Sequence, residues 1–65
     1  MKYRIEIWQW HKLVETYKSE NIKEILKWYK ENWQDIYNMG DCTFYVYEND
    51  RKLTFFEEYK LGFGD

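Results

Sequence analysis

Apolar and polar residues alternate through the first part of the chain, with a break near residues 10–11. Alternation places successive side chains on opposite faces of a β-strand. We therefore predict a hairpin with strands over residues 2–9 and 12–18. Trp10 and His11 form a poor turn signal, so the position of this turn rests on the similarity of the segment to a second hairpin later in the chain.

Pairing Gln9 with Lys12 assigns the side chains of this hairpin to two faces. One face then carries Ile5, Ile7, Val14 and Thr16. The other face carries Arg4, Glu6, Trp8, Leu13, Glu15 and Tyr17. The first set is the more apolar, so we expect it to face the core and the second set to face outward.

The apolar residues then change to steps of three and four, which is the pattern of an amphipathic helix. The residues that follow these steps are Ile22, Ile25, Leu26, Tyr29, Trp33, Ile36 and Tyr37. They fall within about 120° of a helical wheel, as one buried stripe does. Ser19 is a suitable N-cap and Gly40 a suitable left-handed residue after the helix. The pattern predicts a helix over residues 20–38.

Alternation returns after the helix and predicts a second hairpin, with strands over residues 42–48 and 52–59. Asn49 and Asp50 between the strands are residues that tight turns favour. Like the first hairpin, this one carries Lys-Leu just after its turn. Residues 60–65 are expected to form a frayed tail.

The register of the last strand stays open at this point. A two-residue turn directs Leu53 and Phe55 inward, whereas a three-residue turn directs Thr54 and Phe56 inward. In both cases the elements predict a single α+β domain over residues 1–65. Its topology is ββαββ: a four-stranded antiparallel sheet from two hairpins, with one amphipathic helix packed on one face.

The size of the chain limits how it is stabilised. A domain of this size buries only about 60% of the surface that its unfolded chain exposes. Cys42 is the only cysteine of the 65 residues, so an intrachain disulfide is excluded. Cys42 and His11 are also too few soft ligands for structural zinc, which takes four ligands. Aromatic residues make up 23% of the chain and compensate for the small core.

No group of residues predicts catalysis. His11 lies in an expected exposed turn. Cys42 follows Asp41 instead of a basic residue that would activate its thiol, so we expect Cys42 to be a buried structural thiol. Glu57 and Glu58 are neighbours on a predicted strand and point to opposite faces. We therefore expect a protein that is not an enzyme, with no catalytic residues, no metal site and no cofactor.

Charge and hydropathy restrict the partners and the location. The net charge of −2 argues against duplex DNA, which needs a basic surface. No apolar run approaches the roughly 20 residues that span a bilayer, and the first residues lack the pattern of a signal peptide. A lone cysteine fits a reducing compartment. These features predict a cytoplasmic protein with no membrane partner.

More aromatic residues are present than the predicted core can hold. Tyr3, Tyr29, Trp33, Tyr37, Phe44 and one of Phe55 or Phe56 are assigned to the core. The residues left outside are Trp8, Trp10, Tyr17, Trp28, Tyr45 and Tyr47. Exposed aromatic patches mark interfaces, and Tyr and Trp dominate binding hot spots. We expect this set to bind a protein, with an acidic helix stripe of Glu24, Glu31 and Asp35 adding electrostatic contacts.

The segment Lys-Leu-Val-Glu-Thr-Tyr-Lys at residues 12–18, just before an amphipathic helix, belongs to a short acidic chain rich in Lys, Glu, Tyr and Trp. In this style the chain resembles small proteins encoded by phages and prophages of Firmicutes. Many of these are host-takeover or anti-defence inhibitors, including anti-CRISPR proteins, which block a host protein by binding it. The resemblance implies a host protein as partner, contacted by Trp8, Tyr45, Tyr47 and the acidic stripe.

Two other functions fit the same aromatic surplus. The outer sheet face is the interface of a homodimer in one of them, since a marginal monomer gains stability by association. In the other the chain is an oligomeric sponge for a small ligand, in which Trp8, Trp10 or Trp28 stacks on nucleotides. A protein-binding module that inhibits by surface occlusion is our first expectation.

Overall fold

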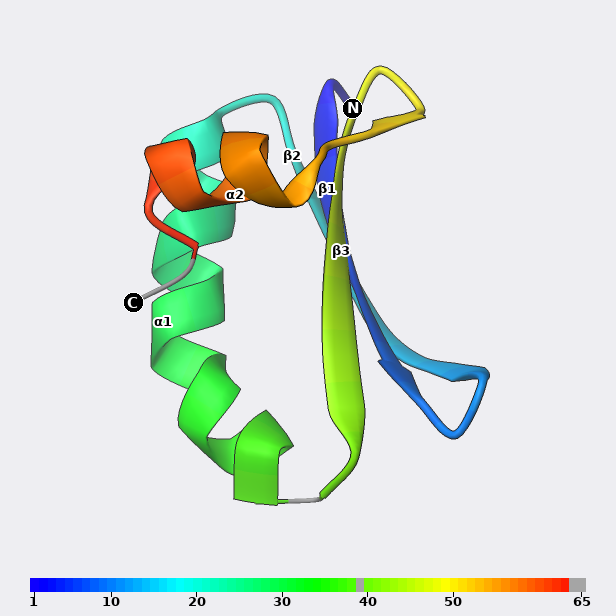
Figure 1. Cartoon of the computed structure of the whole chain (residues 1–65). Helices are drawn as coiled ribbons and strands as arrows, with labels where there is room; N and C mark the ends of the chain where they lie inside the picture. Colours follow the sequence, from blue (N-terminus) through cyan, green and yellow to red (C-terminus); the bar gives the residue numbers. More distant parts are fainter. Residues whose placement is uncertain (39, 64–65) are drawn as a thin grey trace.

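A computed structural model describes residues 1–38 and 40–63 of the chain and contains one sheet and two helices (Figure 1). In chain order the elements are β1 (Tyr3–Gln9), β2 (Lys12–Ser19), α1 (Ile22–Asn38), β3 (Cys42–Glu48), β4 (Arg51–Lys52) and α2 (Phe55–Leu61). The strands form one antiparallel sheet in the order β2-β1-β3-β4. The predicted α+β class and four-stranded antiparallel sheet are confirmed.

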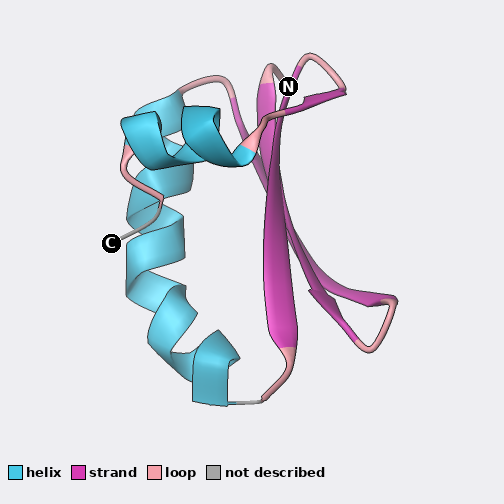
Figure 2. Cartoon of the chain, viewed as in Figure 1, coloured by secondary structure: helices cyan, strands magenta, loops and turns pink. Residues whose placement is uncertain are grey.

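Both helices lie on the same side of the sheet (Figure 2). The second helix, α2, was not predicted. The core fills the space between the helices and the sheet, as in other two-layer domains. Its fully or nearly fully buried apolar residues are Ile5, Ile7, Ile25, Ile36, Val46, Leu53 and Phe63. The predicted inward faces of β1 and β3 are therefore correct at Ile5, Ile7 and Val46.

The first helix begins two residues later than predicted and ends at Asn38 as predicted. Ser19 is the last residue of β2, and its Oγ accepts a hydrogen bond from the backbone N–H of Asn21 at 3.1 Å. Asn21 caps the helix instead, because its Oδ1 accepts from the backbone N–H of Lys23 at 2.9 Å. Tyr37, predicted in the core, is 67% exposed. It lies one residue after buried Ile36, so helical rotation carries it out of the stripe.

A β-bulge interrupts the first hairpin. Trp8 pairs with Leu13, but the next pair joins Ile7 to Glu15. Val14 is therefore the additional residue that the bulge accommodates, and it lies partly exposed. The predicted inward position of Val14 was wrong for this reason.

Beyond the bulge every residue of β2 changes face. Tyr17 lies opposite Ile5 and Thr16 lies opposite Glu6. Residues that lie opposite each other in an antiparallel pair share a face. Tyr17 therefore faces the helices and Thr16 faces outward, which reverses both predictions.

The predicted strand over residues 52–59 was wrong beyond residue 52, because α2 begins at Phe55. Thr54 is the N-cap of α2 and forms a capping box. Its Oγ1 accepts from the Glu57 N–H at 3.2 Å, and the Glu57 carboxylate accepts from the Thr54 N–H at 2.9 Å. Leu53 is buried, as the two-residue turn predicted, whereas neither Phe55 nor Phe56 enters the core.

The segment predicted as a frayed tail also contributes to the fold. Lys60 and Leu61 are part of α2, and Gly62 ends that helix with a φ of 102°, a conformation that favours glycine. The Phe63 N–H then donates to the Glu58 carbonyl at 3.0 Å, and the Phe63 ring is fully buried. Residues 64–65 of the predicted tail lie outside the described residues.

Both hairpin turns adopt left-handed backbone conformations. The φ angles are 55° and 64° at Trp10 and His11, and 51° and 68° at Asn49 and Asp50. Asn and Asp tolerate this conformation, as predicted for the second turn. Neither Trp nor His adopts it as readily as glycine does, so the first turn is a locally strained part of the backbone.

Substituting His11→Gly is expected to stabilise the protein by about 1 kcal/mol, because glycine has no Cβ to oppose the left-handed conformation. The measurement is the midpoint of urea unfolding at an unchanged slope. His11→Ala is the matched control, because it removes the imidazole but keeps the strain, and it should leave the midpoint near that of the wild type. Equal midpoints for the two variants would show that the turn stores no strain.

Candidate functional site

The aromatic residues predicted to bind a partner lie in three different places. Trp8, Tyr45 and Tyr47 are on the outer face of the sheet. Trp10 is exposed in the turn between β1 and β2. Tyr17 and Trp28 lie on the helix side, where they stack with ring centroids 5.3 Å apart and planes 4° apart. The predicted six-residue surface is therefore not continuous.

The stack removes Tyr17 and Trp28 from that surface. Trp28 was predicted outside the buried arc of the helix, but it is half-buried and packs against the core cluster. The bulge in the first hairpin turns Tyr17 toward it. Both rings thus join β2 to α1, and their stacking stabilises the contact between the sheet and the helix.

Charged side chains cover the outer rings of the sheet. The Arg4 guanidinium lies 3.9 Å from the Tyr47 ring centroid, and the Lys52 ammonium lies 4.0 Å from the Tyr45 ring centroid. Such cation–π contacts contribute about 0.5–1 kcal/mol each at exposed sites. Tyr45 and Tyr47 therefore already have intramolecular partners, which makes them less available than the sequence suggested.

Hydrogen bonds fix the same face. Arg4 donates through Nε to Glu6 Oε2 at 2.9 Å and through Nη1 to Asp50 Oδ1 at 2.6 Å. The Trp8 indole N–H donates to Glu6 Oε1 at 3.1 Å. Burial raises the pKa of Glu6, but the hydrogen bonds from Arg4 and Trp8 outweigh it, so the pKa lies below its usual value. Burial, followed by the charge of Glu6, raises the pKa of Tyr47.

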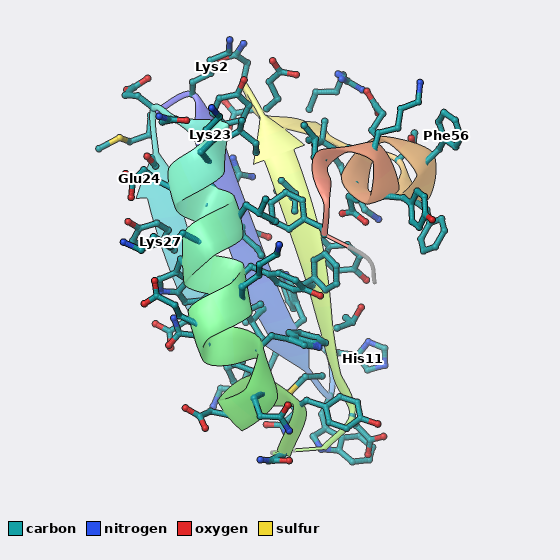
Figure 3. The ribbon with its side chains drawn as sticks, turned by 90° about the vertical axis from the view of Figure 1, so that its left-hand side faces the viewer. Lys2, His11, Lys23, Glu24, Lys27 and Phe56 are labelled. Atoms are coloured by element: carbon teal, nitrogen blue, oxygen red, sulfur yellow. The ribbon has the colours of Figure 1, made fainter. Side chains whose placement is uncertain are left out.

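A shallow hollow of about 500 Å³ remains beside the first turn. Its lining residues are Trp8, Trp10, His11, Asp41, Thr43 and Tyr45. Trp10 and His11 are exposed, as predicted for the turn. Figure 3 shows His11 at the outer edge of the molecule. This hollow unites three of the predicted aromatic residues, Trp8, Trp10 and Tyr45.

The acidic stripe of Glu24, Glu31 and Asp35 is exposed on α1, as the helical wheel predicted. Lysines alternate with it along the same helix, and Figure 3 shows Lys23 and Lys27 close to Glu24 on the solvent side. The exposed surface of α1 therefore carries mixed charge, and the three acidic residues do not form a separate acidic patch.

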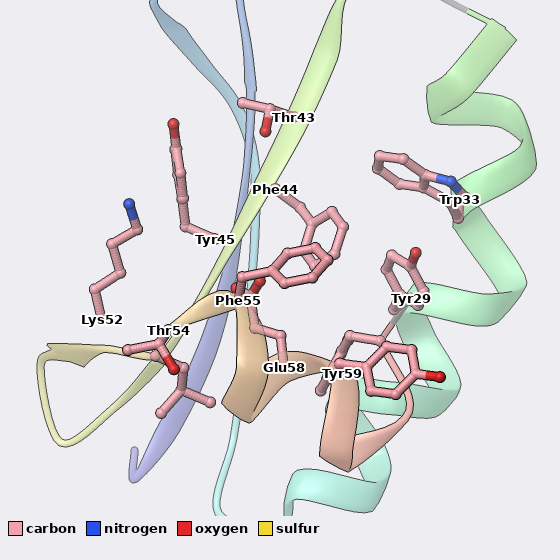
Figure 4. Close-up of a pocket in the computed structure, with 12 residues that line it drawn as sticks. Tyr29, Trp33, Thr43, Phe44, Tyr45, Lys52, Thr54, Phe55, Glu58 and Tyr59 are labelled. Carbon is pink, nitrogen blue, oxygen red and sulfur yellow. The ribbon is translucent and has the colours of Figure 1, made fainter. Parts of the chain in front are cut away.

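A second, larger groove lies elsewhere, between α1, β3 and α2 (Figure 4). It has a volume of about 620 Å³. Its lining residues are Tyr29, Trp33, Thr43, Phe44, Tyr45, Lys52, Leu53, Thr54, Phe55, Glu58, Tyr59 and Phe63. Phe55 and Tyr59 of α2 are 80% and 57% exposed at this groove. The predicted strand over residues 52–59 gave no indication of this groove, because α2 forms one of its walls.

One edge of β3 lines the groove. Hydrogen bonds that involve even-numbered residues of β3 point away from β1: the Val46 carbonyl accepts from the Leu53 N–H at 2.8 Å, and the Val46 N–H donates to Glu58 Oε2 at 3.2 Å. Pairing with β4 covers only Tyr47 and Glu48. Within residues 1–38 and 40–63, no strand pairs with this edge between Cys42 and Tyr45.

Glu58 is the buried charged residue beside this edge. Its carboxylate replaces the acceptor that a longer β4 would have supplied to Val46. Burial raises the pKa of Glu58, and the Val46 N–H and the charge of Lys52 oppose that effect only in part. Where β4 ends, the Val46 N–H is therefore paired with a side-chain oxygen of Glu58 and not with the backbone of a neighbouring strand.

The described residues offer little for other chemistry. Among residues 1–38 and 40–63, no group of three or more His, Cys, Asp or Glu side chains is arranged to hold a metal ion. Cys42, predicted as a buried structural thiol, is only half-buried, and its Sγ lies 3.5 Å from the Gly40 carbonyl oxygen. Neither described helix is long and apolar enough to cross a membrane.

Comparison with protein-family models, curated proteins and solved structures gives no match. The fold and the groove define a small α+β domain with an aromatic groove at an open sheet edge. We refer to this groove, with Phe55 and Tyr59 on its α2 wall, as the α2 groove.

Proposed function

We propose that this chain is a protein-binding module without enzymatic activity, and that it binds its partner at the α2 groove. The observation that carries the proposal is the exposure of Phe55 and Tyr59, at 80% and 57%, on a helix of only seven residues. Large apolar patches beside a concave surface mark interaction sites in soluble proteins. The proposed mode of action is inhibition of a host protein by occlusion of its surface. The resemblance to phage proteins implies this mode.

Energetics favour the groove over the outer face of the sheet. Burying a phenylalanine side chain completely contributes about 1.5–3 kcal/mol, and Phe55 still exposes most of its ring. A partner at the outer face would have to displace Arg4 from Tyr47 and Lys52 from Tyr45 before it gained the same contacts. Contact with Phe55 and Tyr59 in the groove requires neither displacement, because neither ring lies under one of these cations.

The nucleotide-sponge alternative loses one of its three tryptophans, because the stacked Trp28 is not free to take a base. Self-association remains a competing use of the α2 groove. It differs from partner binding in a simple observable, since only self-association changes the mass of the purified protein in solution.

The test is affinity capture from a Firmicute lysate with three matched proteins. We expect the double variant Phe55→Ser/Tyr59→Ser to bind the partner at least tenfold more weakly than the wild type, because two hot-spot aromatics are lost. Phe56→Ser is the control. Phe56 lies on the same helix and is 64% exposed, but it does not line the groove. It should bind within about twofold of the wild type, since isolated exposed positions contribute little.

The captured protein is then purified, and its dissociation constant for each variant is measured directly. Equal affinity of the wild type and the double variant would refute the groove as the binding site. Light scattering coupled to size exclusion tests self-association, the competing use of the α2 groove. A dimer that the double variant converts to a monomer would assign the groove to a second copy of the chain.

A further inference from the structure

The free edge of β3 beside the α2 groove has the geometry of a strand acceptor. We propose that the partner binds there as an additional β-strand along Cys42–Tyr45, with apolar side chains directed into the groove and acidic side chains directed toward Lys52. This inference rests on the proposed function and specifies the chemistry of the partner: an extended, alternating apolar and acidic segment. Strand addition is a common way for a sheet edge to bind a peptide.

The register of the sheet identifies which backbone groups are available. In an antiparallel ladder, alternate residues direct N–H and C=O to opposite sides. Val46 directs both groups away from β1, toward Leu53 and Glu58. Phe44 and Cys42 follow at steps of two, so their N–H and C=O groups also point away from β1. They can form up to four hydrogen bonds with an added strand.

The available edge has a defined end. Glu58 and Leu53 already satisfy Val46, so an added strand must stop before that residue. The free stretch from Cys42 to Tyr45 then measures about 13 Å, since strands rise about 3.3 Å per residue. This length accommodates a segment of about four or five residues. A longer β-partner would meet the start of α2 at Thr54.

The two faces of an added strand would meet different surroundings. Figure 4 shows Phe44, Tyr29 and Trp33 on the helix side of β3, and Tyr45 and Lys52 on the opposite side. A side chain that points to the helix side would enter the aromatic groove beside exposed Phe55. Apolar residues at every second position suit that surface.

Charge complementarity determines the other positions. The Lys52 ammonium lies over the Tyr45 ring, and no described carboxylate lies within ion-pair distance of it. The remaining outward residue of the free edge, Thr43, is uncharged and exposed. An acidic side chain next to Tyr45 would therefore lie near the Lys52 ammonium, which has no carboxylate within ion-pair distance, whereas a basic side chain would be repelled.

A second copy of the chain fits this edge less well. Pairing two β3 edges would bring the Gly40–Asp41 turn of one copy, and the end of its α1, against Leu53 and α2 of the other. A free edge of four residues is also far short of the roughly 20–30 residues that a stable interface buries on each side. An extended segment carries neither the attached helix nor the need for a large interface.

The experiment is a titration of the ¹⁵N-labelled full chain with capped peptides, followed by amide NMR. The probe is the acetylated and amidated pentapeptide Glu-Leu-Glu-Leu-Glu. We expect the Phe44 and Cys42 amides to move downfield and to exchange more slowly with solvent, because they gain hydrogen bonds. The same peptide N-methylated at both leucines cannot donate to the edge and should bind at least tenfold more weakly.

Charge reversal provides the matched pair. The peptide Lys-Leu-Lys-Leu-Lys should bind the wild type about threefold more weakly than the acidic peptide, and Lys52→Glu should reverse that preference. Lys52 is exposed at the end of the sheet, so the substitution should preserve the fold, although it removes the cation near Glu58 and lowers stability somewhat. The spectrum of the free variant serves as the control for folding.

The possible failures are distinguishable. Equal binding of the N-methylated peptide, abolished by Phe55→Ser/Tyr59→Ser, would overturn strand addition and leave groove binding intact. Binding that is unaffected by both N-methylation of the peptide and the Phe55→Ser/Tyr59→Ser substitutions would overturn the proposed function as well. Absence of any shift at Phe44 would overturn strand addition. A Phe44 shift that depends on protein concentration alone would assign the edge to a second copy and also overturn it.

Discussion

Substituting Phe63→Ala is expected to lower the free energy of unfolding by about 3–5 kcal/mol, the range for removing a buried aromatic side chain. The Phe63 ring is fully buried, with its centroid 5.4 Å from that of Tyr29 and 6.3 Å from that of Phe44. Domains of this size have only a few kcal/mol of stability to lose. The variant should therefore be largely unfolded at room temperature, as urea titration monitored by circular dichroism will show.

Phe56→Ala is the matched control for this result, because it removes the same side chain from a residue that is mostly exposed. It should change the free energy of unfolding by no more than about 0.5 kcal/mol. A Phe63→Ala protein as stable as this control would mean that the segment after α2 does not enter the core in solution.

The second large effect is expected at Glu58, where two substitutions separate the charge from the hydrogen bond. Glu58→Gln keeps an oxygen that can accept from the Val46 N–H and removes a buried charge. It should leave stability at pH 7 unchanged or slightly higher. Glu58→Leu leaves that N–H buried without an acceptor and should cost about 1–3 kcal/mol. Equal stability of the two variants in urea would show that the hydrogen bond contributes nothing.

The pH dependence of the Glu58→Gln effect has a defined sign. Burial raises the pKa of Glu58 in the folded state, so the folded protein favours the protonated carboxyl. Its contribution to stability is fully present below the unfolded pKa and is lost as pH rises through the folded pKa. The stability gained by Glu58→Gln should thus be larger at pH 7 than at pH 4. The Arg51 guanidinium lowers the pKa of Glu57 to about 2, an effect that both proteins share.

The sequence predicted the elements whose signals are local. Alternation located β1 and β3, and steps of three and four located α1. Asn49 and Asp50 marked the second turn. The register of β2 was not predictable, because Val14 in the bulge looks like any other apolar strand residue. A single inserted residue exchanges the two faces of a strand, so Tyr17 and Thr16 were both assigned to the wrong side.

The sequence does contain a local signal for α2. Thr54 and Glu57 have the spacing of a capping box, which marks the start of a helix. Phe55 and Phe56 between them are strong strand formers and favoured the strand interpretation. The capping hydrogen bonds and the burial of Phe63 outweigh the strand propensity of these residues. The burial of Phe63 depends on contacts with residues far along the chain.

The aromatic surplus was recognised from the sequence, but its location was not. Side-chain alternation placed Tyr45 and Tyr47 outward correctly. It could not show that Lys52 and Arg4 cover those rings, because both contacts bring together separate strands. The α2 groove was out of reach, since its walls come from α1, β3 and a helix that had been interpreted as a strand.

The strand order has a consequence for how the chain acquires its structure. β1 and β2 are neighbours in sequence, and so are β3 and β4, so each hairpin closes only a short loop. The central pairing joins Tyr3 to Glu48 across the whole of α1. Closing that long loop costs more chain entropy than closing either hairpin. Contacts between β1 and β3 offset this cost only after the two strands have paired. We therefore expect the pairing of β1 with β3 to limit the rate of folding.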